Sequence, residues 1–78
     1  MSTEDKYSQI FIETLSVQAG DLPTLAYQGV PAWDSVGHMH LMACLEDQFD
    51  IELDMDDIID FSSYEVGKEI LRKYDVSI

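Results

Sequence analysis

A chain of 78 residues with 46% apolar residues can form one small domain with a packed core, but not two domains or an enclosed active site. Sixteen acidic residues against four basic ones give a net charge of −12, which disfavours nucleic acid and membrane surfaces as partners and favours basic proteins. The single cysteine, Cys44, excludes an internal disulfide and suits a reducing compartment such as the cytoplasm. The start lacks signal-peptide features, and no apolar run reaches the roughly 18 residues of a membrane span.

The first predicted helix covers about residues 3–17. Apolar residues recur there at helical spacing and define one face: Tyr7, Ile10, Phe11 and Leu15. We expect Ser2 or Thr3 to cap its start and Gly20 to mark its end. Residues 18–33 contain glycines and prolines without a sustained period, so we expect a long loop that apolar side chains pin onto the helices.

The second predicted helix covers residues 35–49 and is capped by Asp34, whose carboxylate can accept a hydrogen bond from a free N–H of the first turn. A broad apolar face is expected from Val36, Met39, Met42, Ala43, Leu45 and Phe49. An acidic link then leads to a short helix over residues 55–60, for which Asp54 is the expected cap.

The last predicted helix begins near Ser62 or Ser63. Ser62 and Glu65 have the spacing of a capping box, in which each side chain satisfies a free N–H at the helix start. We therefore predict an all-α fold: a four-helix bundle with three main helices, a short third helix and a long loop between the first two. The whole chain, residues 1–78, is expected to be one stand-alone, monomeric domain.

The most informative position is Ser35, which directly follows the capping Asp34. A hydroxyl at a helix start lies near free N–H groups and the positive end of the dipole, which favour a phosphate group. Its place at the edge of a long loop also leaves it open to a modifying enzyme. The alternative is a plain capping role, in which the chain is an unmodified acidic helical adaptor that binds basic proteins.

The stretch from Asp34 to Leu53, DSVGHMHLMACLEDQFDIEL, resembles the Asp-Ser-Leu motif and second helix of acyl carrier proteins. Residues 45–49 resemble the family's Leu-Glu-Glu-x-Phe ending, and residues 54–61 resemble its acidic turn and third helix. The resemblance implies that Ser35 receives 4'-phosphopantetheine from coenzyme A, added by a separate phosphopantetheinyl transferase with a magnesium ion. The thiol of this arm then holds an acyl or aminoacyl group as a thioester, and the carrier itself is not an enzyme.

The resemblance also implies docking on the transferase and on enzymes that load and process the cargo. We expect the partner-binding residues to be Val36, Met39, Glu46, Asp47, Asp54, Asp56 and Asp57. No Lys or Arg lies between Tyr7 and Gly67 to neutralise the acids, so charge should dominate docking.

The chain departs from the family pattern close to the serine. Val36 replaces the usual leucine, and Gly37 and His40 stand where many fatty-acid carriers have acids that help to dock basic enzymes. Trp33 and Gly37 resemble residues of carriers dedicated to specialised pathways, including some that carry aminoacyl groups. We therefore expect a specialised pathway rather than general fatty-acid synthesis.

Metal binding is not expected. A calcium-binding loop counted from Asp50 needs Gly at its sixth place and Glu at its twelfth, where the sequence has Met55 and Phe61. His40 and Cys44 lie one helical turn apart but supply only two ligands. We expect both histidines at the surface, and the four methionines in the core or in an adaptable cargo cavity.

Overall fold

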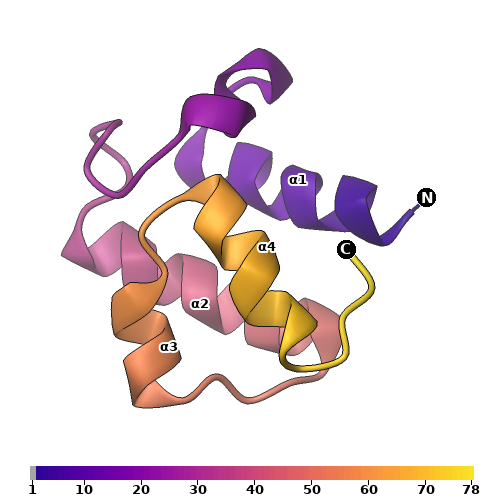
Figure 1. The fold of residues 1–78 in the computed structure, drawn as a ribbon. Coiled ribbons are helices and arrows are strands. Elements are labelled where there is room, and N and C mark those ends of the chain that lie inside the picture. Colours follow the sequence, from indigo (N-terminus) through magenta and orange to yellow (C-terminus); the bar gives the residue numbers. More distant parts are fainter. Residues whose placement is uncertain (1) are drawn as a thin grey trace.

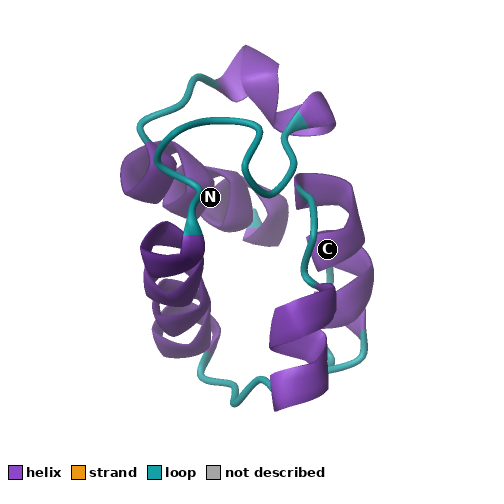
Figure 2. Cartoon of the chain, turned by 90° about the vertical axis from the view of Figure 1, so that its left-hand side faces the viewer, coloured by secondary structure: helices purple, strands orange, loops and turns teal. Residues whose placement is uncertain are grey.

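The structure is a computed structural model and describes residues 2–78. These residues form, in chain order, α1 (Thr3–Leu15), the 3-10 helix η1 (Ala19–Thr24), α2 (Ser35–Phe49), α3 (Met55–Asp60) and α4 (Tyr64–Arg72) (Figure 1). Over the described range there is no strand, only an isolated antiparallel bridge between Ala26 and Ser63, so the fold is all-α (Figure 2). None of these helices has the length and apolar character needed to cross a membrane.

Side-chain caps define the starts of the three longer helices. In each, a side chain accepts a hydrogen bond from the backbone N–H three residues later: Ser2 from Asp5 at 3.1 Å, Asp34 from Gly37 at 2.9 Å, and Ser63 from Val66 at 3.0 Å. Each such cap stabilises its helix by about 1 kcal/mol. The predicted capping box of Ser62 and Glu65 is wrong, because Ser63 is the cap and α4 begins one residue later.

The segment between α1 and α2 is more ordered than the predicted loop. The left-handed backbone of Ser16 (φ 56°) ends α1 before Gly20, which lies inside η1. The start of η1 is closed by Gln18 and Asp21, since the Gln18 N–H donates to the Asp21 carboxylate at 3.3 Å. A 3-10 helix has about three residues per turn, so its apolar residues do not follow the 3.6-residue period of an α-helix.

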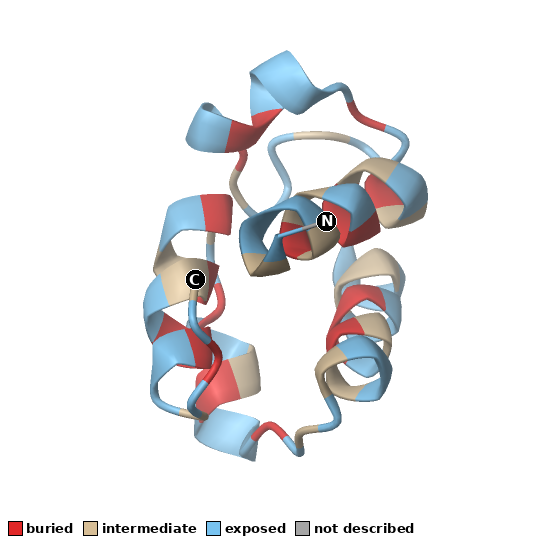
Figure 3. Cartoon of the chain, turned by 90° about the vertical axis from the view of Figure 1, so that its right-hand side faces the viewer, coloured by how far each residue is buried: buried red, intermediate tan, exposed pale blue. Residues whose placement is uncertain are grey.

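The core is centred on Phe11, the middle of the apolar face predicted for α1. Its ring centroid lies 4.8 Å from that of Tyr7, 5.6 Å from Trp33, 5.2 Å from Tyr64 and 6.2 Å from Phe61. Aromatic pairs contribute about 0.5–1.5 kcal/mol each beyond the area that they bury. These rings come from α1, α4 and the two segments that precede α2 and α4, so one cluster joins them, and Figure 3 marks the buried residues in red along the chain.

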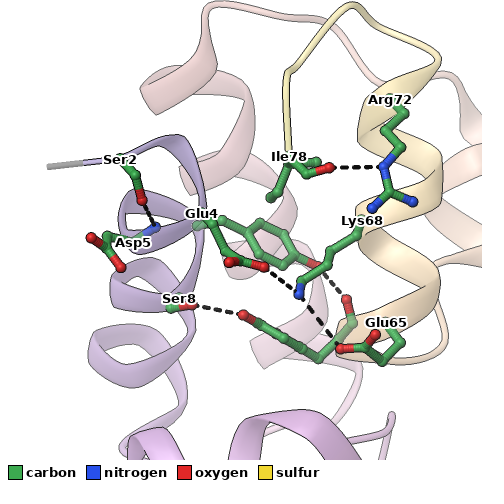
Figure 4. A network of polar contacts seen from close by, with 10 residues as sticks. Ser2, Glu4, Asp5, Ser8, Glu65, Lys68, Arg72 and Ile78 are labelled. Carbon is green, nitrogen blue, oxygen red and sulfur yellow. Dashed lines mark hydrogen bonds and ion pairs between the residues drawn. The ribbon is translucent and has the colours of Figure 1, made fainter.

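Polar contacts join α1 to α4 at the edge of this cluster (Figure 4). The Lys68 ammonium lies 2.6 Å from the Glu4 carboxylate and 3.6 Å from that of Glu65. The Tyr7 hydroxyl donates to the Tyr64 carbonyl at 2.7 Å. Burial, together with nearby Tyr64 and Glu65, raises the pKa of the Tyr7 phenol well above its ordinary value, so this donor keeps its proton.

The apolar face predicted for α2 is divided in the structure. Met42 and Leu45 are buried together with Leu41, whereas the side chains of Val36 and Met39 are 79% and 55% exposed. The first part of α2 therefore presents apolar groups to the surface directly beside Ser35.

Gly67 provides a test of the packing between α1 and α4. A Cβ at Gly67 would lie 2.2 Å from Phe61 Cζ and 2.3 Å from the Tyr7 hydroxyl, whereas nothing lies within 4 Å of one at Gly20. Overpacking should make Gly67→Ala less stable by about 1–3 kcal/mol, while Gly20→Ala should change stability by less than about 1 kcal/mol. Urea unfolding measures both, and equal midpoints for the two variants would contradict this packing.

Candidate functional site

Ser35 is the first residue of α2 and is exposed. Asp34 holds the helix start in place, because its carboxylate accepts the Gly37 N–H at 2.9 Å and its carbonyl accepts the His38 N–H at 2.8 Å. The hydroxyl of Ser35 therefore lies at a fixed point of the backbone and is open to approach.

The chain before Ser35 folds closely over the first turn of α2. Gly37 faces this segment, and a Cβ there would lie 1.9 Å from the Ala32 carbonyl oxygen. Position 37 consequently has no room for any side chain without a shift of the backbone. An acidic side chain at position 37 is therefore excluded by packing.

A chain of hydrogen bonds links this segment to α3. The buried Trp33 indole donates from Nε1 to His38 Nδ1 at 2.9 Å, and His38 Nε2 lies 2.7 Å from the Ile58 carbonyl oxygen. Because an indole N–H is only a donor, His38 is neutral in this arrangement and donates its own proton to Ile58. The expectation of a surface position is wrong for His38, which is half-buried, and right for His40, which is exposed.

Tyr27 also reaches the start of α2, which the sequence did not indicate. Its hydroxyl lies 3.5 Å from Ser35 Oγ. Its ring packs edge-on against the rings of Trp33 and His38, with centroid distances of 6.3 and 5.3 Å. Tyr27 thus places an aromatic side chain beside Ser35, and the rings of Trp33 and His38 pack behind it.

An apolar cavity of about 350 Å³ lies between α2 and α3 and reaches Ser35. It is lined by Tyr27, Ser35, His38, Met39, Met55, Ile58, Ile59, Phe61 and Ser62. Met39 and Met55 line it, Met42 is buried in the core, and Met1 lies outside the described residues. The cavity therefore offers flexible, mainly apolar side chains directly beside an exposed hydroxyl.

The other side of α3 is fixed by α4 and the residues that follow it. The buried Asp57 carboxylate accepts hydrogen bonds from the Lys73 ammonium and the Tyr74 hydroxyl. These two bonds, that of Lys73 first, hold the pKa of the Asp57 carboxyl below its ordinary range. The Asp54 N–H donates to the Tyr74 hydroxyl at 3.0 Å, while the Asp54 side chain makes no capping bond.

The acids predicted to bind partners do not form one uniform surface. Asp47, Asp54 and Asp56 are exposed and form no ion pair among residues 2–78. Glu46 is half-buried, and its carboxylate accepts the Leu53 N–H at 2.8 Å. Asp57 is only 7% exposed and forms an ion pair with Lys73. The sequence did not reveal this pair, because Lys73 lies beyond the stretch from Tyr7 to Gly67 that contains no Lys or Arg.

Within residues 2–78 no three metal-ligating side chains come together. Cys44 is half-buried, and its sulfur accepts a long contact of 3.9 Å from the Thr14 hydroxyl, whereas His40 is exposed. Among the described residues, His40 and Cys44 are therefore not joined by a third metal ligand.

Comparison of the chain with protein-family models, with curated proteins and with solved structures finds no match in any of the three. The resemblance to acyl carrier proteins therefore stays a prediction from the residues around Ser35, whose geometry the structure supplies. That geometry consists of an exposed hydroxyl at a capped helix start, an aromatic side wall and an adjoining apolar cavity.

The Asp57 contacts predict how acid affects stability. Because its pKa is lowered on folding, the carboxylate stabilises the fold fully above about pH 3.9, the ordinary value, and this stabilisation is lost as the pH falls through the lowered pKa. Asp57→Asn should therefore unfold at lower urea than the wild type at neutral pH, and the difference should shrink on acidification. Asp56→Asn, at an exposed position without an ion pair, is the control. A difference that stays constant down to pH 2 would contradict the assigned ion pair.

Proposed function

We propose that this chain is an acyl carrier protein that holds acyl or aminoacyl groups as thioesters on a 4'-phosphopantetheine arm attached to Ser35. The observation that carries the proposal is the setting of Ser35, an exposed hydroxyl that the Asp34 cap fixes beside an apolar cavity. The order of the elements, with a short α3 between α2 and α4, supports the four-helix bundle that the resemblance implies.

In the proposed modification, Ser35 Oγ forms a bond to the phosphorus of coenzyme A that bears the pantetheine group. The bond from that phosphorus to the departing 3'-phosphoadenosine 5'-phosphate breaks, and the hydroxyl proton passes to a base. Among the described residues, the one side-chain hydrogen bond of Ser35 is with the Tyr27 hydroxyl, and the Asp34 carboxylate accepts the Gly37 N–H. In this proposal the base and the metal ion belong to the transferase, and this chain is its substrate.

The residues around Ser35 also fit the cargo role. The terminal thiol of the bound arm supplies the thioester chemistry, and this chain supplies the surface beside it. Met39 and Ile59 are 55% and 70% exposed, so an acyl group resting on them would cover apolar surface that the fold leaves in water.

The charge near Ser35 supports a specialised pathway. Residues 35–45 contain no acid, and the exposed Asp47, Asp54 and Asp56 lie at the far end of α2 and around α3. A partner that needs a carboxylate in the first two turns of α2 finds none. General fatty-acid synthesis enzymes, which dock on acids there according to the resemblance, should therefore bind this carrier weakly.

The exposed acids without ion pairs also favour the second candidate, an unmodified adaptor for basic proteins. In that case Ser35 serves only to begin α2, and the cavity beside it has no covalent occupant. Modification of Ser35 separates the two functions, because an adaptor needs no arm.

The first test is the intact mass of the protein after incubation with coenzyme A, magnesium and a broad-specificity transferase. The wild type should gain one phosphopantetheine, and Ser35→Ala should gain none while unfolding at the same urea concentration. Ser62→Ala is the matched control, because Ser62 is an exposed serine that lines the same cavity, and it should be modified fully. An unmodified wild type would favour the adaptor, and a modified Ser35→Ala would show that the attachment point is wrong.

A second prediction concerns the acids at the end of α2. Asp47→Lys should weaken association with the transferase by roughly threefold to tenfold at low salt, since it reverses one exposed interfacial charge. Glu46 is unsuitable for this test because its carboxylate holds the Leu53 N–H.

Glu13→Lys, an equal change of net charge on the exposed surface of α1, is the control and should have little effect. Added salt should reduce the difference between the two variants, because the Debye length falls to about 10 Å at 0.1 M. An equal loss of affinity for the transferase in both variants would show that the effect comes from net charge alone.

A further inference from the structure

Tyr27 belongs to the segment between η1 and α2, but its backbone is held by two distant parts of the chain. Its N–H donates to the Ser62 carbonyl at 2.8 Å, in the segment before α4. The next residue, Gln28, donates to the Trp33 carbonyl at 2.9 Å with its backbone in the left-handed region (φ 64°). The Tyr27 backbone therefore has a defined position relative to both α2 and α4.

The ring of Tyr27 is also fixed in orientation. It packs edge-on against Trp33 and His38, which are themselves joined by the indole hydrogen bond. The aromatic ring has few rotatable bonds, so little conformational entropy remains to be lost when its hydroxyl binds a group. The hydroxyl is thus held near Ser35 by the ring, not by its own hydrogen bond.

Within the described part of the chain, this hydroxyl makes only a weak hydrogen bond. Among residues 2–78 its one side-chain partner is Ser35 Oγ, at 3.5 Å. Hydroxyl–hydroxyl bonds are usually about 2.7–2.8 Å long, so this contact is weak. A stronger acceptor on Ser35 would take its place.

We propose that Tyr27 is a positioning residue for modified Ser35, donating a hydrogen bond to a phosphate oxygen of the attached arm. This inference rests on the proposed function. A phosphate oxygen lies two bonds from Ser35 Oγ, which brings it within reach of a hydroxyl 3.5 Å from that atom. The acceptor is then anionic, and charge-assisted bonds are shorter and about twice as strong as neutral ones.

The bond gives the arm a direction. Tyr27 and Ser35 both line the cavity between α2 and α3, so a phosphate anchored between them lies at the cavity edge. The pantetheine part of the arm, which follows the phosphate, then begins beside Met39 and Met55 rather than in open solvent.

The test compares wild-type protein with Tyr27→Phe, both carrying the arm, by phosphorus NMR and by carbon relaxation of the labelled pantetheine methyl groups. Tyr27→Phe keeps the ring contacts and removes only the hydroxyl. The phosphorus resonance should shift, and the methyl groups nearest the phosphate should gain nanosecond mobility. Ser62→Ala, which alters the same cavity without touching Ser35, should match the wild type.

A second measurement uses the wild type alone, so its result does not depend on how well Tyr27→Phe accepts the arm. With carbon-labelled tyrosine, the Cζ resonance of Tyr27 should move when the arm is added, while those of Tyr7, Tyr64 and Tyr74 should not. Identical phosphorus shifts and methyl mobility in Tyr27→Phe and wild type would overturn the role of Tyr27 and leave modification of Ser35 intact. Failure of the wild type to accept the arm would overturn both.

Discussion

The hydrogen bond from the Trp33 indole to His38 determines how the rest of the site is arranged. Trp33 is fully buried, and its N–H must find an acceptor, which His38 Nδ1 supplies at 2.9 Å. His38 is then restricted to the tautomer that donates to Ile58, so one ring ties the segment before α2 to the last turn of α3. Loss of His38 would leave the buried indole N–H unpaired, at a cost of about 1–3 kcal/mol. Ser35 lies two residues after Trp33, and its place relative to α3 follows from this bond.

Helix α3 depends on its neighbours for its position. A helix of six residues is too short to be stable alone, because few of its hydrogen bonds offset the cost of nucleation. His38 holds its last turn, and the Asp57 contacts with Lys73 and Tyr74 hold its other side. The cavity beside Ser35 has α3 as one wall, so these side chains decide its shape although they are distributed over α2, α3 and the end of the chain.

Local sequence patterns were sufficient to predict most of the helices. The bounds 35–49 and 55–60 agree with the structure, because the Asp34 cap and the apolar spacing act within a few residues. The 3-10 helix, which has no 3.6-residue period, was not predictable in this way.

The details of the site were less predictable, because they depend on contacts between distant residues. His38 resembles a surface residue until Trp33 and Ile58 are brought to it, and Asp57 resembles a free acid until Lys73 lies beside it. Tyr27 reaches Ser35 only because its backbone pairs with the chain before α4. The spacing of residues along the sequence does not predict these contacts between distant residues.

The close contact between Gly37 and the Ala32 carbonyl limits where single mutations can add a charge near Ser35. Positions 36, 39 and 40 are exposed, so a single substitution can place a charge there without disturbing the backbone. At position 37 the first added carbon already meets the Ala32 oxygen, at 1.9 Å. A charged residue at position 37 therefore requires that the segment before α2 change first. The Ala32 carbonyl thus constrains the order in which mutations can arise.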